Sequence, residues 1–348
     1  MGIRSNLKAA AVHGLHAMHV PRLAGPALGV KGAILTFHEI HESAEAELWT
    51  GCEAKFLEAS IRWFRNSGWD IVTLDEALRR LRDDEDKRQF AVFTFDDAYR
   101  DNFTRALPIL RREQVPFTMY VPTASITREL YAWWLGLREL VRANDEIDVA
   151  CLGITVSCTD LPSKRAALSM ATEWAYKNYD QVSQFGHTFS KYGISLRRLC
   201  DRYFLNEDEL KSVAAEPLST IGAHTVSHVP LSTLGAADIS RELIDNRAYL
   251  EGCLNRPIDH FAYPYGSAAA CGAREASLAR EAGFVTAVTT SNRPLFKKDL
   301  AKPHALPRIS FHSRSSTTAH LDVETSGLTR ATVRNLFLRP ATHSQSKM

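Results

Sequence analysis

Short apolar segments alternate along the chain with longer segments in which apolar residues recur every three or four positions. The short segments carry β-branched and aromatic residues without interrupting charges, which is typical of strands buried on both faces of a parallel sheet. We therefore predict strands over seven segments, 32–38, 71–74, 90–95, 115–122, 219–223, 260–264 and 284–289.

The longer segments predict helices between these strands. Asp75 is expected to cap the second helix, and Pro108 is expected to kink the third. Repeated strand–helix units imply a largely parallel sheet, either open or closed into a barrel. In such sheets reactive groups lie at the carboxyl ends of the strands. The predicted helices cover 53–66, 76–84, 99–112, 236–252 and 274–282.

The alternation of strands and helices is interrupted once and later ends, so the sequence predicts four regions of the chain. The barrel is expected to comprise 30–127 and 216–311, with a mostly helical insertion at 128–215. Residues 312–348 are expected to form a polar tail, rich in Ser and Thr, with a short helix at 331–338 and a disordered end. Residues 1–29 are expected to form a helical extension.

The extension predicts an amphipathic helix rather than a signal peptide, because His13, His16 and His19 interrupt its apolar stretch. Two locations for this helix are compatible with the sequence: against the barrel, or on a membrane surface. The three histidines can share one face, which is compatible with a metal site, but an ordinary, partly exposed helix face is the favoured interpretation.

Composition excludes several classes of function. The 348 residues are 45% apolar and 24% charged, which is ordinary for a globular protein. The net charge of +2 gives no basis for a nucleic-acid partner, and no run of apolar residues is long enough to cross a membrane. The six cysteines include no C-x-x-C pair, so we expect reduced thiols of a cytoplasmic protein rather than a cysteine zinc site.

Candidate chemistry begins with Asp96 and Asp97, which directly follow the predicted strand 90–95. Adjacent residues on a strand point to opposite sides, so two neighbouring carboxylates can have separate roles. A strand end followed by a helix cap also explains this dipeptide. The choice between these interpretations depends on which groups elsewhere in the chain face the two carboxylates.

Two further strand ends carry candidate partners. His224 and His228 follow the strand 219–223, and histidines four residues apart on a helical turn can bind one metal ion. With one Asp they would leave coordination positions open, as catalytic sites require. The turn Tyr263-Pro264-Tyr265-Gly266 ends the strand 260–264 and can present an N–H group to an oxyanion, although taken alone it is better explained as a simple turn.

Together, the motifs TFDD (94–97), HTVSH (224–228) and YPYG (263–266) resemble the polysaccharide deacetylase family, also called the NodB homology domain or carbohydrate esterase family 4. The resemblance covers 30–127 and 216–311. It implies an α/β fold, a distorted (β/α) barrel of about seven parallel strands. It also implies removal of the N-acetyl group from an amino sugar of the N-acetylglucosamine type, in a poly- or oligosaccharide or a lipid-linked glycan.

The resemblance also implies a role for each matching residue. Asp96 would be the general base, and the N–H of Tyr265 would help to stabilise the oxyanion, with Tyr263 and Pro264 beside it in the substrate site. The metal is expected to be zinc. Its ligands would be Asp97, His224 and His228.

The chain departs from the family pattern at two points. Many members carry an arginine two residues before the proline of the third motif, where this chain has Ala262. Arg308 is the candidate replacement that would support the base; a surface or capping arginine is the alternative. No acid histidine is evident after residue 290, but residues 34–40 resemble a first-strand motif of circularly permuted members. That motif would make His38 the general acid, and a structural histidine is the alternative.

Trp133 and Trp134 of the insertion are candidates for lining the substrate site, because exposed aromatic side chains commonly stack on sugar rings. The alternative is that they form the insertion's own core. Two other functions remain open at this stage. One is a deacylase or deformylase acting on another small amide, and the other is a catalytically silent carbohydrate-binding barrel.

Overall fold

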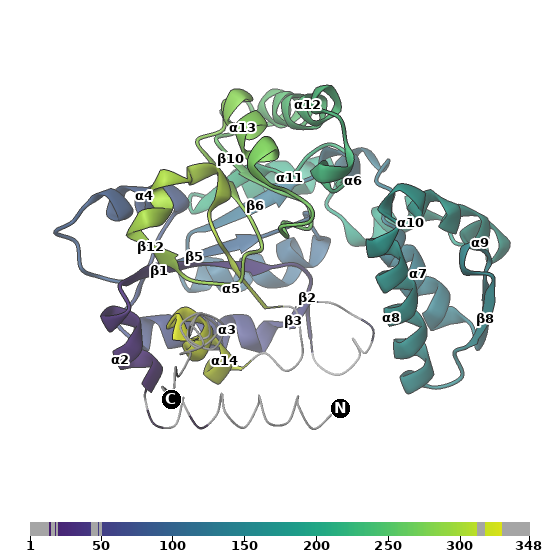
Figure 1. Ribbon diagram of the computed structural model, residues 1–348, viewed down its shortest axis with the longest axis horizontal. Coiled ribbons are helices and arrows are strands. Elements are labelled where there is room, and N and C mark those ends of the chain that lie inside the picture. Colours follow the sequence, from purple (N-terminus) through teal and green to yellow (C-terminus); the bar gives the residue numbers. More distant parts are fainter. Residues whose placement is uncertain are drawn as a thin grey trace, which may run out of the picture.

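The computed structural model describes residues 14, 18, 20–42, 48, 51–311 and 317–328. Seven strands, each parallel to its neighbours, form its centre (Figure 1). In pairing order they are β11 (Thr286–Val288), β10 (His260–Ala262), β9 (Ser219–Ala223), β6 (Phe117–Val121), β5 (Phe90–Phe95), β1 (Val30–Phe37) and β13 (Ile309–Ser310).

One segment of the chain connects the two edges of this sheet, because it pairs with both. β13 pairs with β1, and three residues earlier Leu306 forms a parallel bridge with Val288 of β11. The sheet therefore curls into a distorted barrel, which confirms the predicted fold. The predicted ranges of β5 and β9 agree with the structure, whereas β13 was not predicted.

Six short strands of the described chain lie outside this ring, and two of them belong to the insertion described below. β4 (Asp70–Ile71) pairs in parallel with the start of β5, and β12 (Leu295–Phe296) is antiparallel to β1. β2 (Ile40–His41) and β3 (Cys52–Glu53) form a separate parallel pair. None of these strands contributes a residue to the predicted motifs.

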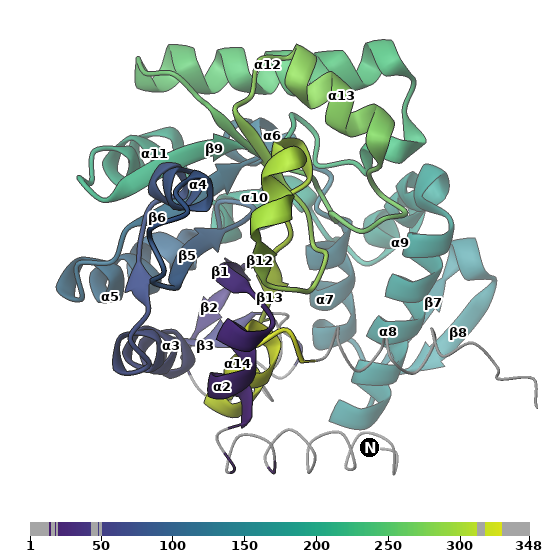
Figure 2. The ribbon, with the colours of Figure 1, turned by 60° about the vertical axis from the view of Figure 1, so that its left-hand side comes forward.

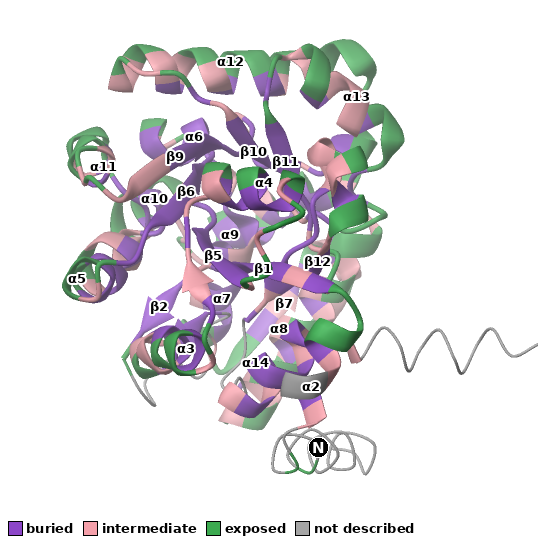
Figure 3. Cartoon of the chain, turned by 90° about the vertical axis from the view of Figure 1, so that its left-hand side faces the viewer, coloured by how far each residue is buried: buried purple, intermediate pink, exposed green. Residues whose placement is uncertain are grey.

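Helices cover the outside of the barrel, with their apolar residues turned to the sheet (Figure 3). α4 (Leu74–Arg82) instead packs Leu74, Leu78 and Leu81 against residues inside the barrel. Thr73 caps this helix by accepting the N–H of Glu76, so the prediction that Asp75 is the cap was wrong. The outer helices are α3 (Ala54–Asn66), α5 (Leu107–Arg112), α11 (Glu207–Ala214), α12 (Ala236–Leu254) and α13 (Ala273–Glu281).

The predicted helix 99–112 is divided. A π-helical segment, Asn102–Ala106, precedes α5, and Pro108 lies in the first turn of α5. Proline is tolerated there because the first N–H groups of a helix have no partner within it.

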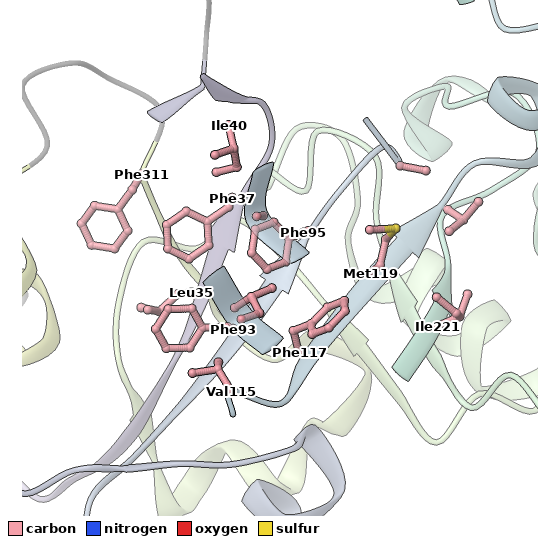
Figure 4. Packing of buried hydrophobic residues seen from close by; sticks show 14 of the residues in the cluster. Leu35, Phe37, Ile40, Phe93, Phe95, Val115, Phe117, Met119, Ile221 and Phe311 are labelled. Carbon is pink, nitrogen blue, oxygen red and sulfur yellow. The ribbon is translucent and has the colours of Figure 1, made fainter. Parts of the chain in front are cut away.

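Alternation along the strands separates an outer apolar layer from the barrel interior. Leu35, Phe37, Phe93 and Phe95 belong to the cluster that packs against the outer helices (Figure 4). Phe37 stacks on Phe93, Phe95 and Phe311, with ring centroids 5.7, 5.4 and 6.3 Å away. Because side chains alternate between faces, the residues between these aromatic positions point into the barrel.

The insertion forms a separate lobe beside the barrel (Figure 1). It has its own core, to which Trp133, Phe185 and Phe189 belong. Two features differ from the prediction: a β-hairpin interrupts the helices, and α11 packs Leu210 and Val213 into the barrel's outer core. The elements of the lobe are α7 (Trp133–Ala143), β7 (Glu146–Val149), β8 (Ile154–Ser157), α8 (Leu161–Lys177), α9 (Phe185–Lys191) and α10 (Leu196–Tyr203).

The ends of the described chain lie together near α3 (Figure 2). α2 (Val20–Ala27) contacts α14 (Thr318–Thr325), which lies within the predicted polar tail but buries Leu321 in the main core. His13, His16, His19, the predicted helix 331–338 and the last ten residues lie outside the described residues. Within the described chain, no helix combines the length and the apolar character that crossing a membrane requires.

A prediction about stability follows from the tight contact between β9 and β6. A methyl carbon on Gly222 would lie 2.5 Å from ring carbons of Tyr120 and 2.9 Å from the carbonyl oxygen of His260. Gly222→Ala should therefore lower the free energy of unfolding by about 1–3 kcal/mol, measured by urea denaturation. Gly252→Ala in α12, where a methyl group meets nothing within 4 Å, should raise it by about 0.4–1 kcal/mol. Equal stabilities of the two variants would contradict this account.

Candidate functional site

Asp96 and Arg308 form an ion pair in the barrel interior. Thr94 and Asp96 continue the inward-facing positions of β5, and Arg308 lies in the segment that closes the sheet. The guanidinium donates to both carboxylate oxygens at 2.7 Å, to Thr94 Oγ1 at 3.1 Å and to the carbonyl of Thr289 at 3.2 Å. Arg308 is completely buried, so its partners rather than water satisfy its charge.

The pair keeps Asp96 ionised. Burial alone would raise the pKa of Asp96, but the Arg308 guanidinium and, to a smaller extent, the His224 ring lower the pKa below its usual value. A carboxylate has about four acceptor positions. Asp96 therefore retains the capacity to accept a proton or a further hydrogen bond while it is bound to Arg308.

The second carboxylate faces two histidines. Asp97 Oδ1 lies 3.3 Å from Nε2 of His224 and 3.1 Å from Nε2 of His228. All three residues are buried, and one ligand atom from each lies within 4.8 Å of the others. Asp97 Oδ1 has no hydrogen-bond partner among the described residues. Burial would raise the pKa of Asp97, but His228 and His224 lower it well below its usual value.

This cluster fits a divalent cation. His224 Nδ1 lies 2.6 Å from the carbonyl oxygen of Ala262, which can only accept, so Nδ1 carries a proton. In the neutral ring, Nε2 then presents a lone pair toward Asp97 Oδ1. A lone pair and a carboxylate do not stabilise each other unless a cation or a proton lies between them. Burial lowers the pKa of His228, whereas Asp97 and Asp96 overcome burial and raise the pKa of His224.

The backbone at these motifs is strained. Five of the eight non-glycine residues with positive φ in the described part of the chain lie here, with φ between 56° and 72°. Such conformations persist only where the surroundings enforce them, and they concentrate at functional sites. The five residues are Asp97, Ala98, Thr225, His228 and Tyr265.

Two residues of α12 hold the histidine loop in this shape. Glu242 accepts the N–H groups of Val226 and Ser227 at 2.8 and 2.9 Å, and Asn246 accepts the N–H of His224 at 2.9 Å. The Asn246 amide in turn donates to the carbonyl of Val121. No pattern in the sequence marked Glu242 or Asn246, because each acts through backbone groups of a distant loop.

His38 lies at the end of β1, on the same side of the barrel. Its Nε2 is 4.0 Å from Asp96 Oδ2, and its side chain is 27% exposed. The imidazole is therefore close to the carboxylate and still accessible from the cavity described next. This position is compatible with the predicted acid and also with a structural histidine.

A cavity of about 660 Å³ opens over these groups, between the barrel and the insertion. Trp133, Trp134, Tyr263 and Tyr265 all line it. Trp133 also belongs to the insertion's core, as the alternative interpretation proposed. Pro264 does not line the cavity; its carbonyl accepts the N–H of Gly266 and shapes the turn. In the described structure, the N–H of Tyr265 has no protein acceptor.

Two tyrosines of the insertion were missed by the sequence analysis. Tyr179 donates to the carbonyl of His228 at 3.3 Å and meets the hydroxyl of Tyr265 at the same distance. The Tyr176 ring contacts that of Tyr265, with centroids 5.8 Å apart. Their helical surroundings carry no strand-end motif, so only the folded insertion reveals their position.

Comparison with known proteins gives a consistent picture. Residues 83–287 match the family model described as "Polysaccharide deacetylase". A poly-beta-1,6-N-acetyl-D-glucosamine N-deacetylase of Escherichia coli (strain K12) is 25% identical over 126 residues, which cover 31% of this chain. The match spans only 19% of that relative's length.

Two solved structures share the fold. The deacetylase PplD of Streptococcus pyogenes, in complex with acetate, has a TM-score of 0.55 and 18% identity, over 85% of this chain and 99% of that one. IcaB from Ammonifex degensii has a TM-score of 0.54 and 16% identity, over 85% and 96% of the two chains.

The buried ion pair yields a prediction with a defined pH dependence. Arg308→Met leaves Asp96 buried without a counter-charge, so it should lower the free energy of unfolding by about 3–5 kcal/mol at pH 7. In the parent protein, the lowered pKa of Asp96 contributes stability above its unfolded pKa of about 4, and this is lost as the pH falls. In the variant, burial raises the pKa of Asp96, so protonation relieves the penalty as the pH decreases.

The difference between parent and variant should therefore be smaller at about pH 4 than at pH 7, measured by urea denaturation of the metal-free proteins. Arg65→Met, which removes an exposed ion pair with Glu113, should cost at most about 1 kcal/mol at either pH. A penalty for Arg308→Met that does not change with pH would show that Asp96 is not the group responsible.

Proposed function

Because this chain belongs to the polysaccharide deacetylase family, we propose that it hydrolyses the N-acetyl group of an amino sugar in a metal-dependent reaction. Water adds to the acetyl carbonyl, the C–N bond breaks, and acetate and the free amine leave. The observation that best supports the proposal is that Asp97, His224 and His228 converge beside an ionised Asp96.

Asp97, His224 and His228 would hold the cation, and zinc suits this set of one carboxylate and two imidazoles with an open position. A bound zinc ion would lower the pKa of a coordinated water toward about 7 and polarise the carbonyl of the substrate. Asp96 would accept the proton of the attacking water, because Arg308 holds it ionised while one side of the carboxylate remains available.

The remaining groups suit the later steps of the reaction. The N–H of Tyr265 is available to donate to the oxyanion that forms on the acetyl group. His38 would donate a proton to the leaving nitrogen as the C–N bond breaks, since an unprotonated amine anion is a poor leaving group. His38 Nε2 lies 4.0 Å from Asp96 Oδ2, which supports roles for these two residues as the acid and the base of one reaction.

The cavity favours a short glycan or the end of a longer one. Its volume of about 660 Å³ falls in the range of roughly 300–1,000 Å³ typical of small-molecule sites. Tyr176, Trp134 and Tyr265 supply aromatic faces against which a pyranose ring can stack. A lipid-linked glycan is compatible with this shape, because only its sugar end needs to enter.

Two substitutions test the proposed roles of Asp96 as the base and of His224 as a metal ligand. Asp96→Asn should retain the metal and lower kcat by about 10²–10⁴-fold, because the water loses its proton acceptor. His224→Ala should lose both the metal and the activity. Acetate release from N-acetylglucosamine oligomers gives the activity, and metal analysis of the purified protein gives the zinc content.

Asp245→Asn is the matched control, because Asp245 is an exposed carboxylate of α12, and it should leave both quantities unchanged. A chelator should abolish acetate release, and added zinc should restore it. Near-normal turnover of Asp96→Asn would refute the assignment of the base, and turnover that survives the chelator would refute the metal-dependent reaction.

The role of His38 has its own test. His38→Ala should lower kcat on N-acetyl sugars by about 10²–10⁴-fold with the metal retained. The loss should be much smaller on p-nitroacetanilide, whose weakly basic amine departs without prior protonation. His187→Ala, at an exposed position of α9, should change neither rate. Equal losses on both substrates would mean that His38 does not protonate the leaving group.

A further inference from the structure

The two candidate histidine ligands are held in different ways. His224 is fixed from behind, because its Nδ1 donates to the carbonyl of Ala262 at 2.6 Å. The Nδ1 of His228 has no hydrogen-bond partner among the described residues. A metal-binding histidine is ordinarily oriented by a hydrogen bond to the ring nitrogen that does not face the metal. Some other contact must therefore fix the His228 ring.

Packing of aromatic rings supplies that contact. The centroid of the His228 ring lies 5.1 Å from the centroids of Trp134 and of Tyr265, with interplanar angles of 54° and 47°. His228 is only 7% exposed, so its ring has little space in which to rotate. Tyr265 belongs to the barrel, whereas Trp134 comes from α7 of the insertion.

Trp134 is itself held firmly. Its indole Nε1 donates to the hydroxyl of Tyr99 at 2.8 Å, and Tyr99 lies two residues after Asp97. The Tyr99 ring packs on Phe204, with centroids 5.0 Å apart. Trp134 thus spans from the loop of one candidate ligand, Asp97, to the ring of another, His228.

We propose that Trp134 is a positioning residue for the metal ligand His228, and that its ring does by packing what the hydrogen bond to Ala262 does for His224. The inference rests on the proposed function, since it supposes that a cation binds to Asp97, His224 and His228. It makes the insertion a part of the metal site, in addition to a wall of the substrate cavity.

The decisive measurement is the affinity for Zn²⁺, determined by competition with a chromogenic chelator. Trp134→Leu keeps an apolar side chain but removes the ring, and it should weaken Zn²⁺ binding by about 10–100-fold, the usual effect of losing a group that orients a ligand. Trp134→Phe retains a ring against His228 and should lose less affinity than Trp134→Leu. The absorption bands of bound Co²⁺ should shift in Trp134→Leu, because they report the geometry of the ligands.

Trp174→Leu is the matched control. Trp174 is a half-buried tryptophan of the same insertion, packs on Phe185 with centroids 5.2 Å apart, and does not line the cavity. It should lower the thermal unfolding temperature while leaving the Zn²⁺ affinity and the Co²⁺ spectrum unchanged. This separates a local effect on His228 from general destabilisation of the insertion.

Parental Zn²⁺ affinity and an unaltered Co²⁺ spectrum in Trp134→Leu would overturn the inference and leave the proposed function intact. An equal loss of affinity in Trp174→Leu would also overturn it, because the effect would then come from the fold of the insertion. A parent protein that binds no Zn²⁺ at the chelator's detection limit would overturn both the inference and the metal-dependent function.

Discussion

The ion pair between Arg308 and Asp96 is the interaction on which the site depends. Burying two charges costs several kcal/mol per ion unless geometry and further hydrogen bonds compensate for the lost water. The bidentate contact, together with Thr94 and Thr289, provides this compensation. Thr94 belongs to β5, Thr289 directly follows β11, and Arg308 lies in the segment that closes the sheet, so an ionised Asp96 requires the strands to be assembled around the barrel interior.

The same barrel gives two neighbouring carboxylates different surroundings. Asp96 follows the inward-facing series of β5 and reaches Arg308, while the positive φ of Asp97 turns the chain toward the histidine loop. Burial alone would raise both pKa values, but the guanidinium of Arg308 lowers the pKa of Asp96, and His228 and His224 lower that of Asp97, so each lies below its usual value. Two adjacent acids would otherwise repel each other and raise one of the two pKa values.

The sequence predicted the barrel because its signals are local. β5 and β9 are short segments without charged residues that end at polar motifs, and their predicted bounds agree with the structure. The segment with Arg308 was not predicted as a strand, since two paired residues leave no periodicity to detect. The β7–β8 hairpin was missed because each of its strands has only four residues, two of them polar.

Within the site, motif residues could be named from the sequence, whereas their supports could not. Glu242 and Asn246 act on backbone N–H groups of a loop more than a dozen residues earlier in the chain, and such contacts leave no pattern in the sequence. At Ala262 the chain lacks the arginine that many family members use to support the base. The carbonyl of Ala262 holds His224, and Arg308, which directly precedes β13, lies against Asp96.

The attachment of the insertion argues against a carbohydrate-binding barrel without catalysis. Two of its polar links to the barrel reach loops that carry candidate catalytic groups: Arg138 pairs with Glu39, the residue after His38, and Trp134 donates to Tyr99 near Asp97. A binding module needs aromatic walls and hydrogen-bonding groups, but it gains nothing from a buried carboxylate held ionised beside a second carboxylate and two imidazoles. Each of these groups costs stability when buried, so their joint presence is best explained by chemistry that uses all of them.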